Sequence, residues 1–199
     1  ITNRHEGRGG WSSYHYAYIQ SYGGLTNPFY NATANPTWGA HFNFTTYMTN
    51  QGYTSVDYVF INLGTNDVSQ RYVDVIWQTD AMIASIHEYD PNIKIIIGLS
   101  EGVYRPKMEW DSRNTWLIGL NAEKIKKYDR RDSENIYVCP LYLNMDLYKD
   151  YALTDVPLSA RDTVNTRQYT SDGIHQNTVG FNKNADTMYY TIKGINWWH

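Results

Sequence analysis

The chain has 199 residues, a length typical of one domain with one core. Hydrophobic residues make up 42% and charged residues 19% of it, which is a globular composition and excludes a disordered protein. The net charge of -3 argues against a nucleic-acid or anionic-membrane partner held by bulk electrostatics, and no run of about 18 apolar residues is present to span a membrane.

The first feature along the chain is the stretch 22–52, which is rich in Gly, Pro, Asn and aromatic residues. This composition predicts a long ordered loop with one short helix at its end. The whole chain holds 19 tyrosines and 7 tryptophans. Such residues either fill a core or line a sugar-binding surface, because an aromatic ring stacks on the C–H face of a pyranose.

From residue 56 onward, short apolar runs alternate with stretches of helical period. The runs 56–64, 93–100 and 135–143 lack polar alternation, which predicts strands buried on both faces. The helical stretches are 72–89, 112–128 and 178–194. Their expected core faces are Tyr72, Ile76, Ile83 and Ile86; Ile118, Ala122 and Ile125; and Phe181, Ala185, Met188 and Ile192.

The order of these elements predicts an α/β fold with a parallel sheet and right-handed crossovers, in one domain over residues 1–199. A second irregular stretch is expected at 148–171. The single cysteine, Cys139, lies in an apolar run and is expected in the core. One cysteine allows neither a disulfide within the chain nor a Cys-based zinc site.

The first candidate motif is Gly64-Thr65-Asn66-Asp67, at the end of the run 56–64. In open α/β sheets, ligands bind beyond the carboxyl ends of the strands. A glycine lets the chain turn sharply there, and an asparagine side chain offers an N–H donor. The other interpretation is ordinary turn chemistry.

The second candidate motif is Asp172-Gly173-Ile174-His175, just before the last helical stretch. An aspartate three residues before a histidine can place its carboxylate against the imidazole, which suits a general base. The other interpretation is a helix-capping Asp172 and an exposed His175.

Together, in this order, the two motifs resemble those of the SGNH hydrolases, the GDSL esterase/lipase-like superfamily. The resemblance implies a three-layer α/β/α, flavodoxin-like parallel sheet and a serine hydrolase mechanism. It places Asn66 in the oxyanion hole, His175 as the base and Asp172 as its partner. In the segment "EGRGGW" it matches Gly10, or less well Gly9, to the oxyanion-hole glycine.

The family's Gly-Asp-Ser block, which carries the nucleophile, does not occur in the 199 residues. We therefore expect the domain to be incomplete at its N-terminus, with the first strand and the serine supplied by an upstream segment or a second chain. Ser12, Ser13 and Ser100 are less suitable, because they lack the strand-to-helix turn of an activated nucleophile.

The resemblance implies a serine esterase, and the aromatic content favours acetyl esters on carbohydrate as its substrate. The alternative is a catalytically inactive SGNH-like module that binds glycan or builds a larger assembly. No cofactor or metal is implied, since the remaining histidines have no metal-ligand spacing and are expected on the surface or in loops. The extracellular space, or a cell or virion surface, is the favoured location.

Overall fold

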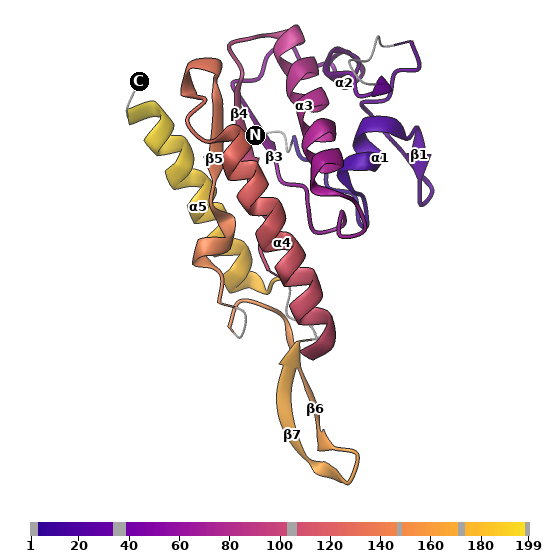
Figure 1. Cartoon of the computed structure of the whole chain (residues 1–199), viewed down its shortest axis with the longest axis vertical. Coiled ribbons are helices and arrows are strands. Elements are labelled where there is room, and N and C mark those ends of the chain that lie inside the picture. Colours follow the sequence, from indigo (N-terminus) through magenta and orange to yellow (C-terminus); the bar gives the residue numbers. More distant parts are fainter. Residues whose placement is uncertain (1–3, 34–38, 103–106, 147–148, 171–173, 198–199) are drawn as a thin grey trace. The chain divides into compact units, whose positions relative to one another are not determined.

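The computed structural model describes residues 4–33, 39–102, 107–146, 149–170 and 174–197 (Figure 1). The chain divides into two compact units. The first comprises Ile1–Ile97 and Glu123–Tyr137, and the second comprises Gly98–Ala122 and Val138–His199. The fold is mixed α/β with a three-stranded parallel sheet flanked by helices, which agrees with the expected α/β class.

The central sheet has the strand order β3-β4-β5 and contains all three predicted strands. These are β3 (Tyr58–Ile61), β4 (Lys94–Gly98) and β5 (Ile136–Cys139). β3 and β4 are parallel, with Tyr58 opposite Lys94 and Ile61 opposite Ile97. The middle strand is the most buried, since Ile95, Ile96 and Ile97 are fully covered. This burial on both faces explains why the strands appear in the sequence as unbroken apolar runs.

The N-terminal region holds α1 (Ser13–Tyr18), the short strands β1 (Ser21–Tyr22) and β2 (Leu25–Thr26), and α2 (Phe44–Gln51). In the described residues of the predicted loop, aromatic rings stack on one another, and the ring centroid of Phe29 lies 4.6 Å from that of Phe42 and 4.3 Å from that of Tyr47. The expected short helix at its end is α2, whose first turn is capped by Asn43 through a 2.7 Å bond from the Thr46 N–H. Several aromatic residues of this stretch therefore serve the core.

Helix α3 (Tyr72–Tyr89) has the bounds that its sequence period predicts. Ile76, Ile83 and Ile86 of its expected face are buried, whereas Tyr72 is half-buried. Both α1 and α2 contact α3. This packing sets the position of α1 and of the Gly9-Gly10 segment that precedes it.

The expected core face of α4 is wrong, and that of α5 is correct only in part. In α4 (Lys107–Tyr128), Ile118 is 69% exposed, and Ala122 and Ile125 are exposed as well. In α5 (Thr178–Trp197), Phe181 is 54% exposed and Ala185 is exposed, whereas Met188 and Ile192 are half-buried. Among the described residues, the buried ones are Asn114, Leu117, Leu120, Asn121, Lys124 and Tyr128 of α4, and Gly180, Thr187 and Ile195 of α5.

Hydrogen bonds to polar side chains explain why the buried faces of α4 and α5 differ from the expected faces. The side chain of Asn121 donates a 2.9 Å bond to the Ser100 carbonyl, and Lys124 donates a 2.6 Å bond to the Leu63 carbonyl. In α5, Thr187 accepts a 2.7 Å bond from the Asn144 amide. A hydrophobicity pattern cannot anticipate a buried face whose side chains are satisfied by hydrogen bonds.

The expectation of an irregular stretch at 148–171 is also wrong, because most of it forms an antiparallel hairpin. β6 (Leu153–Ser159) pairs with β7 (Asp162–Thr170), and the register shifts between Pro157 and Ser159. Among the described side chains of the hairpin, Val164 is 89% exposed and most of the others are exposed as well. Strands with mostly exposed side chains lack the alternation of apolar and polar residues by which a sequence reveals a half-buried strand.

Two short 3-10 helices flank β5 in the chain. The helix η2 (Asp132–Glu134) precedes the strand, and the helix η3 (Leu141–Asn144) follows it. Cys139 is a buried free thiol in β5, which confirms its expected place in the core. In the part of the chain that the structure describes, no helix combines the length and the apolar character needed to cross a membrane.

Candidate functional site

The Gly64-Thr65-Asn66-Asp67 motif forms a tight turn shortly after β3. The Asp67 N–H donates a 2.9 Å bond to the Gly64 carbonyl, and the Gln70 N–H donates a 2.8 Å bond to the Asp67 carbonyl. Gly64 has a φ of 144°, a backbone conformation that other residues rarely adopt. The motif therefore follows the carboxyl end of β3, as the sequence predicts.

Asp67 anchors this turn to the start of α1. Its side chain is fully buried and accepts two 2.9 Å bonds, from the Ser13 N–H and the Ser13 hydroxyl. The Gln70 amide also donates to this carboxylate. Below the turn, the buried ammonium of Lys124 donates to the Leu63 carbonyl and lowers the pKa of Asp67 by its charge. Asp67 is thus held in a structural position.

Asn66 joins the turn to the glycine segment at the N-terminus. Its exposed side chain donates a 3.1 Å bond to the Trp11 carbonyl, across 55 positions of sequence. Gly10, the residue before Trp11, has a φ of 77°, which disfavours any residue with a Cβ. The structure therefore brings together Gly10 and Asn66, two of the four predicted site residues.

The burial of Asp67 gives it an unusual pH dependence. Desolvation raises the pKa of this carboxyl to about 6, and the two bonds from Ser13 act against that rise. Because the folded pKa exceeds the unfolded value of 3.8, the folded protein keeps a proton that the unfolded chain releases. The contribution of Asp67 to the free energy of unfolding is therefore at its maximum below pH 3.8 and is lost as the pH rises through about 6.

We expect this group to lower the free energy of unfolding by about 2 kcal/mol between pH 4 and pH 7. The Asp67→Asn variant cannot ionise and should lack that fall. Urea midpoints of the wild type and the variant across this pH range provide the measurement. Ser13→Ala, which removes a donor, should move the fall to higher pH. Parallel curves for wild type and Asp67→Asn would contradict the burial of a titrating carboxyl.

His175, the third predicted site residue, lies in the second unit, on the short segment before α5. Its side chain is exposed, and its backbone carbonyl accepts a 3.3 Å bond from the Ala152 N–H. The next residue, Gln176, forms an antiparallel bridge with Tyr151. Asp172 and Gly173 of the same motif lie outside the described residues.

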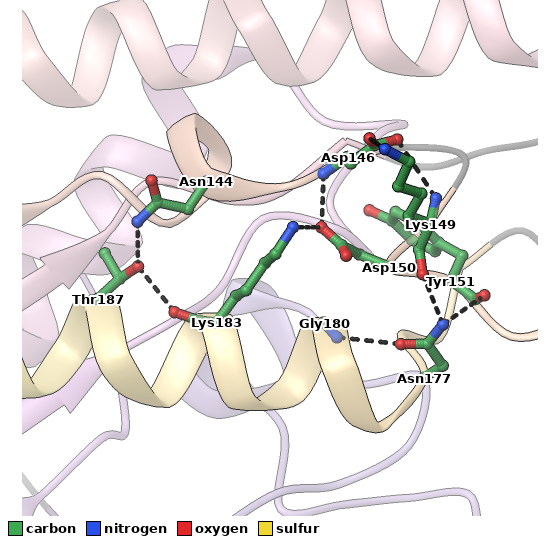
Figure 2. A network of polar contacts seen from close by, with 9 residues as sticks. All are labelled: Asn144, Asp146, Lys149, Asp150, Tyr151, Asn177, Gly180, Lys183 and Thr187. Carbon is green, nitrogen blue, oxygen red and sulfur yellow. Dashed lines mark hydrogen bonds and ion pairs between the residues drawn. The ribbon is translucent and has the colours of Figure 1, made fainter.

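Asn177 fixes the end of this segment and caps α5 (Figure 2). Its side-chain oxygen accepts a 3.0 Å bond from the Gly180 N–H, and its amide donates to the carbonyls of Lys149 and Tyr151. Asn177 therefore fills the capping role that one interpretation of the motif gave to Asp172. His175 lies two residues before this anchor, so hydrogen bonds hold its own carbonyl and the residues that follow it.

A buried ion pair supports the same helix start (Figure 2). Asp150 is fully buried, and its Oδ2 accepts 2.6 Å bonds from the Lys183 ammonium and the Asp146 N–H. Its Oδ1 has no hydrogen-bond partner among the described residues. Removing the cation would leave an uncompensated buried charge, so Lys183 is needed to keep Asp150 in place beneath α5.

Gly180 lets α5 approach Asp150 closely. A Cβ at this position would meet the Asp150 carbonyl oxygen and would lie 2.8 Å from the Gln176 Cβ. The clash involves backbone, which cannot move aside without shifting the whole segment.

Gly180→Ala is therefore expected to lower the free energy of unfolding by about 3 kcal/mol. The matched control is Gly194→Ala in the same helix, where a Cβ meets nothing within 4 Å. That change should stabilise the protein by up to about 1 kcal/mol, because alanine favours helix over glycine. Urea denaturation of both variants measures the contrast. Equal stabilities would show that the contact with Asp150 does not exist.

The three serines considered as alternative nucleophiles, Ser12, Ser13 and Ser100, are buried. Ser13 and Ser100 are almost fully buried. Ser12 is 5% exposed, and its hydroxyl lies 2.8 Å from the His15 Nδ1, which also accepts the Ser12 N–H. This Ser12–His15 contact is a capping box at the start of α1, so His15 is half-buried in a helix rather than in a surface loop.

Sequence reasoning missed the residues that hold the motifs. Lys124 and Asn177 act on carbonyl groups far away in sequence, and neither lies in a recognisable pattern. A weak signal existed only for Asn177, since an asparagine directly before a helical period is a cap signal. Within the described residues, no three His, Cys, Asp or Glu side chains cluster in a way that could hold a metal ion.

Comparison with known proteins adds no assignment. No protein-family model matches the chain, and no curated protein matches it. The function must therefore be argued from the residues and their geometry.

Proposed function

We propose that the chain belongs to a serine esterase of the SGNH type, with a flavodoxin-like three-layer sheet. The observation that carries the proposal is the bond between the Asn66 amide and the Trp11 carbonyl. It joins the two segments that hold the proposed oxyanion donors, Gly10 and Asn66. An amide has two N–H bonds, and the contact with Trp11 uses one of them.

In the proposed mechanism, a serine attacks the ester carbonyl, and His175 takes the proton of its hydroxyl. Asp172 orients the imidazole and stabilises its charged form. The Gly10 N–H and the second N–H of Asn66 donate to the oxygen that becomes negative in the tetrahedral intermediate. His175 then gives its proton to the leaving alcohol, and water hydrolyses the acyl-enzyme by the same steps.

The proposed nucleophile comes from outside these 199 residues, on an upstream segment or a second chain. Two observations support this assignment. The Gly-Asp-Ser block is absent from the sequence, and Ser12 and Ser13, which follow the glycine segment, are buried in contacts with His15 and Asp67. A nucleophile needs a hydroxyl that substrate can reach.

The proposed substrates are acetyl esters on carbohydrate. The test offers the native protein acetylated xylose and cellobiose beside p-nitrophenyl esters of two to sixteen carbons. We expect activity on the acetylated sugars and the acetyl ester, and a steep loss with longer acyl chains. Hydrolysis of long acyl esters without activity on acetylated sugars would overturn the substrate class.

A second candidate is an SGNH-like module without catalytic activity, which binds glycan or builds an assembly. The absence of the Gly-Asp-Ser block from the chain favours it. The positions of Gly10 and Asn66 favour the enzyme, because a decayed site has no need of an exposed amide beside a positive-φ glycine. Absence of turnover on every ester above would select the module.

A further inference from the structure

A cleft of about 740 Å³ lies within the first unit, against α1 and α3. Its size is within the range of roughly 300–1,000 Å³ that small-molecule sites occupy. Three of its lining residues are aromatic: Tyr14 and Tyr18 of α1 and Trp77 of α3. The cleft contains none of the residues proposed for ester hydrolysis.

The aromatic rings of the cleft are open to a ligand. Tyr14 is 45% exposed and Trp77 is 50% exposed, although both are large enough to fill a core. Tyr14 and Tyr18 stand one helical turn apart, with ring centroids 5.3 Å from each other and planes tilted by 39°. Aromatic surface left exposed beside polar groups is characteristic of a binding site.

Each carboxylate of the cleft has a cationic partner, which is Lys127 of the lining for Asp80 and Arg71, outside the lining, for Asp74. Asp74 accepts bonds of 2.8 and 2.6 Å from Arg71, and Asp80 lies 3.1 Å from the Lys127 ammonium. The two carboxylates are thus matched by two cations. A cationic ligand would have to compete with Arg71 and Lys127, so the lining favours a ligand without net charge.

A chain of amides leads from the cleft to the turn at Asp67. Gln70 donates to the Asp67 carboxylate, and its oxygen accepts a 2.7 Å bond from the Gln78 amide nitrogen. Because an ionised carboxylate only accepts, these bonds fix the orientation of both amides. Gln78 is 4% exposed, and its Oε1 has no hydrogen-bond partner among the described residues.

We propose that this cleft binds a neutral carbohydrate with pyranose rings. The C–H face of a sugar ring would stack on Trp77 and the tyrosines, and the ring hydroxyls would bond to the amides and carboxylates that line the cleft. An apolar ligand would remove these polar groups from water without replacing the hydrogen bonds to water that it displaces, which costs free energy. The binding stands apart from the proposed esterase activity and needs no nucleophile.

The test titrates the full chain with xylohexaose, cellohexaose, maltohexaose and N-acetylchitohexaose, with tryptophan fluorescence and calorimetry as readouts. We expect at least one to bind with a Kd on the order of 0.1–1 mM. Trp77→Ala should raise that Kd at least tenfold. The matched control is Trp197→Ala, which removes another exposed tryptophan, 81% exposed, from α5 and should leave the Kd unchanged.

Tyr14→Ala changes a second exposed residue of the cleft. The site can therefore still be tested if the Trp77→Ala variant does not fold. Binding that persists in both Trp77→Ala and Tyr14→Ala would overturn the site. Binding of choline chloride but of none of the four sugars would overturn the ligand class, and no binding of any probe would overturn the proposal as a whole. Because binding is measured without turnover, these outcomes do not depend on esterase activity.

Discussion

Replacing His175 with alanine is expected to lower kcat for ester hydrolysis by the native protein about 10⁴-fold or more. The imidazole is the only proposed base, and without it the attacking serine keeps its proton. The side chain is exposed, so the free energy of unfolding should change by less than about 1 kcal/mol. Steady-state kinetics on an acetyl ester, together with urea denaturation, provide the measurement.

His5→Ala is the matched control, because it removes another exposed histidine that has no proposed role in catalysis. It should retain wild-type kcat. If the His175→Ala variant kept more than a tenth of the wild-type activity, His175 would not be the base, and the resemblance in the segment 172–175 would be a chance match.

Asn66→Ala has the second largest expected effect. Removing one oxyanion donor should lower kcat about 100- to 1,000-fold, while KM changes little, because the donor acts mainly in the transition state. The variant also loses the bond to the Trp11 carbonyl, which should reduce stability by only about 1 kcal/mol. Separate values of kcat, KM and the free energy of unfolding distinguish the catalytic role from the structural one.

Asn92→Ala serves as the control for that change, since Asn92 is an exposed turn residue that bonds to Asp90. A loss of stability at Asn66→Ala with kcat within tenfold of wild type would mean that Asn66 only holds the turn. The ordinary turn interpretation of Gly64-Thr65-Asn66-Asp67 would then be correct.

The sheet could be predicted from sequence because its burial leaves a clear pattern. β4 is covered on both faces, so its run of isoleucines has no polar interruption. The bounds of α3 were predictable for a related reason, since its buried face is apolar and repeats with the period of a helix. In both cases the hydrophobic effect alone determines which side chains are inside.

The faces of α4 and α5 could not be predicted in full, because polar side chains share their buried positions with apolar ones. Lys124 of α4 and Thr187 of α5 are both buried, and each has a specific partner, the Leu63 carbonyl or the Asn144 amide. Such contacts join residues far apart in sequence, and a hydropathy pattern assigns lysine to the solvent. The hairpin of β6 and β7 was missed because most of its described side chains are exposed, so they give no alternation of apolar and polar residues.

The candidate site was predictable only in part. The contact of Asn66 with Trp11 joins the turn at 64–67 to the glycine segment before α1. The residues that hold the motifs 64–67 and 172–175 in place were found only in the structure. They are Ser13, which donates to Asp67, and Asn177, which caps α5 two residues after His175. Hydrogen bonds to distant backbone carbonyls leave no periodic trace in a sequence.

The most direct test of the account is fluorophosphonate labelling of the native protein, followed by peptide mass spectrometry. The reagent reacts with a serine only where a base and an oxyanion hole are assembled around it. We predict a label on a serine that lies outside these 199 residues. A label on Ser12, Ser13 or Ser100, or no label on the folded native protein, would contradict the proposed serine esterase.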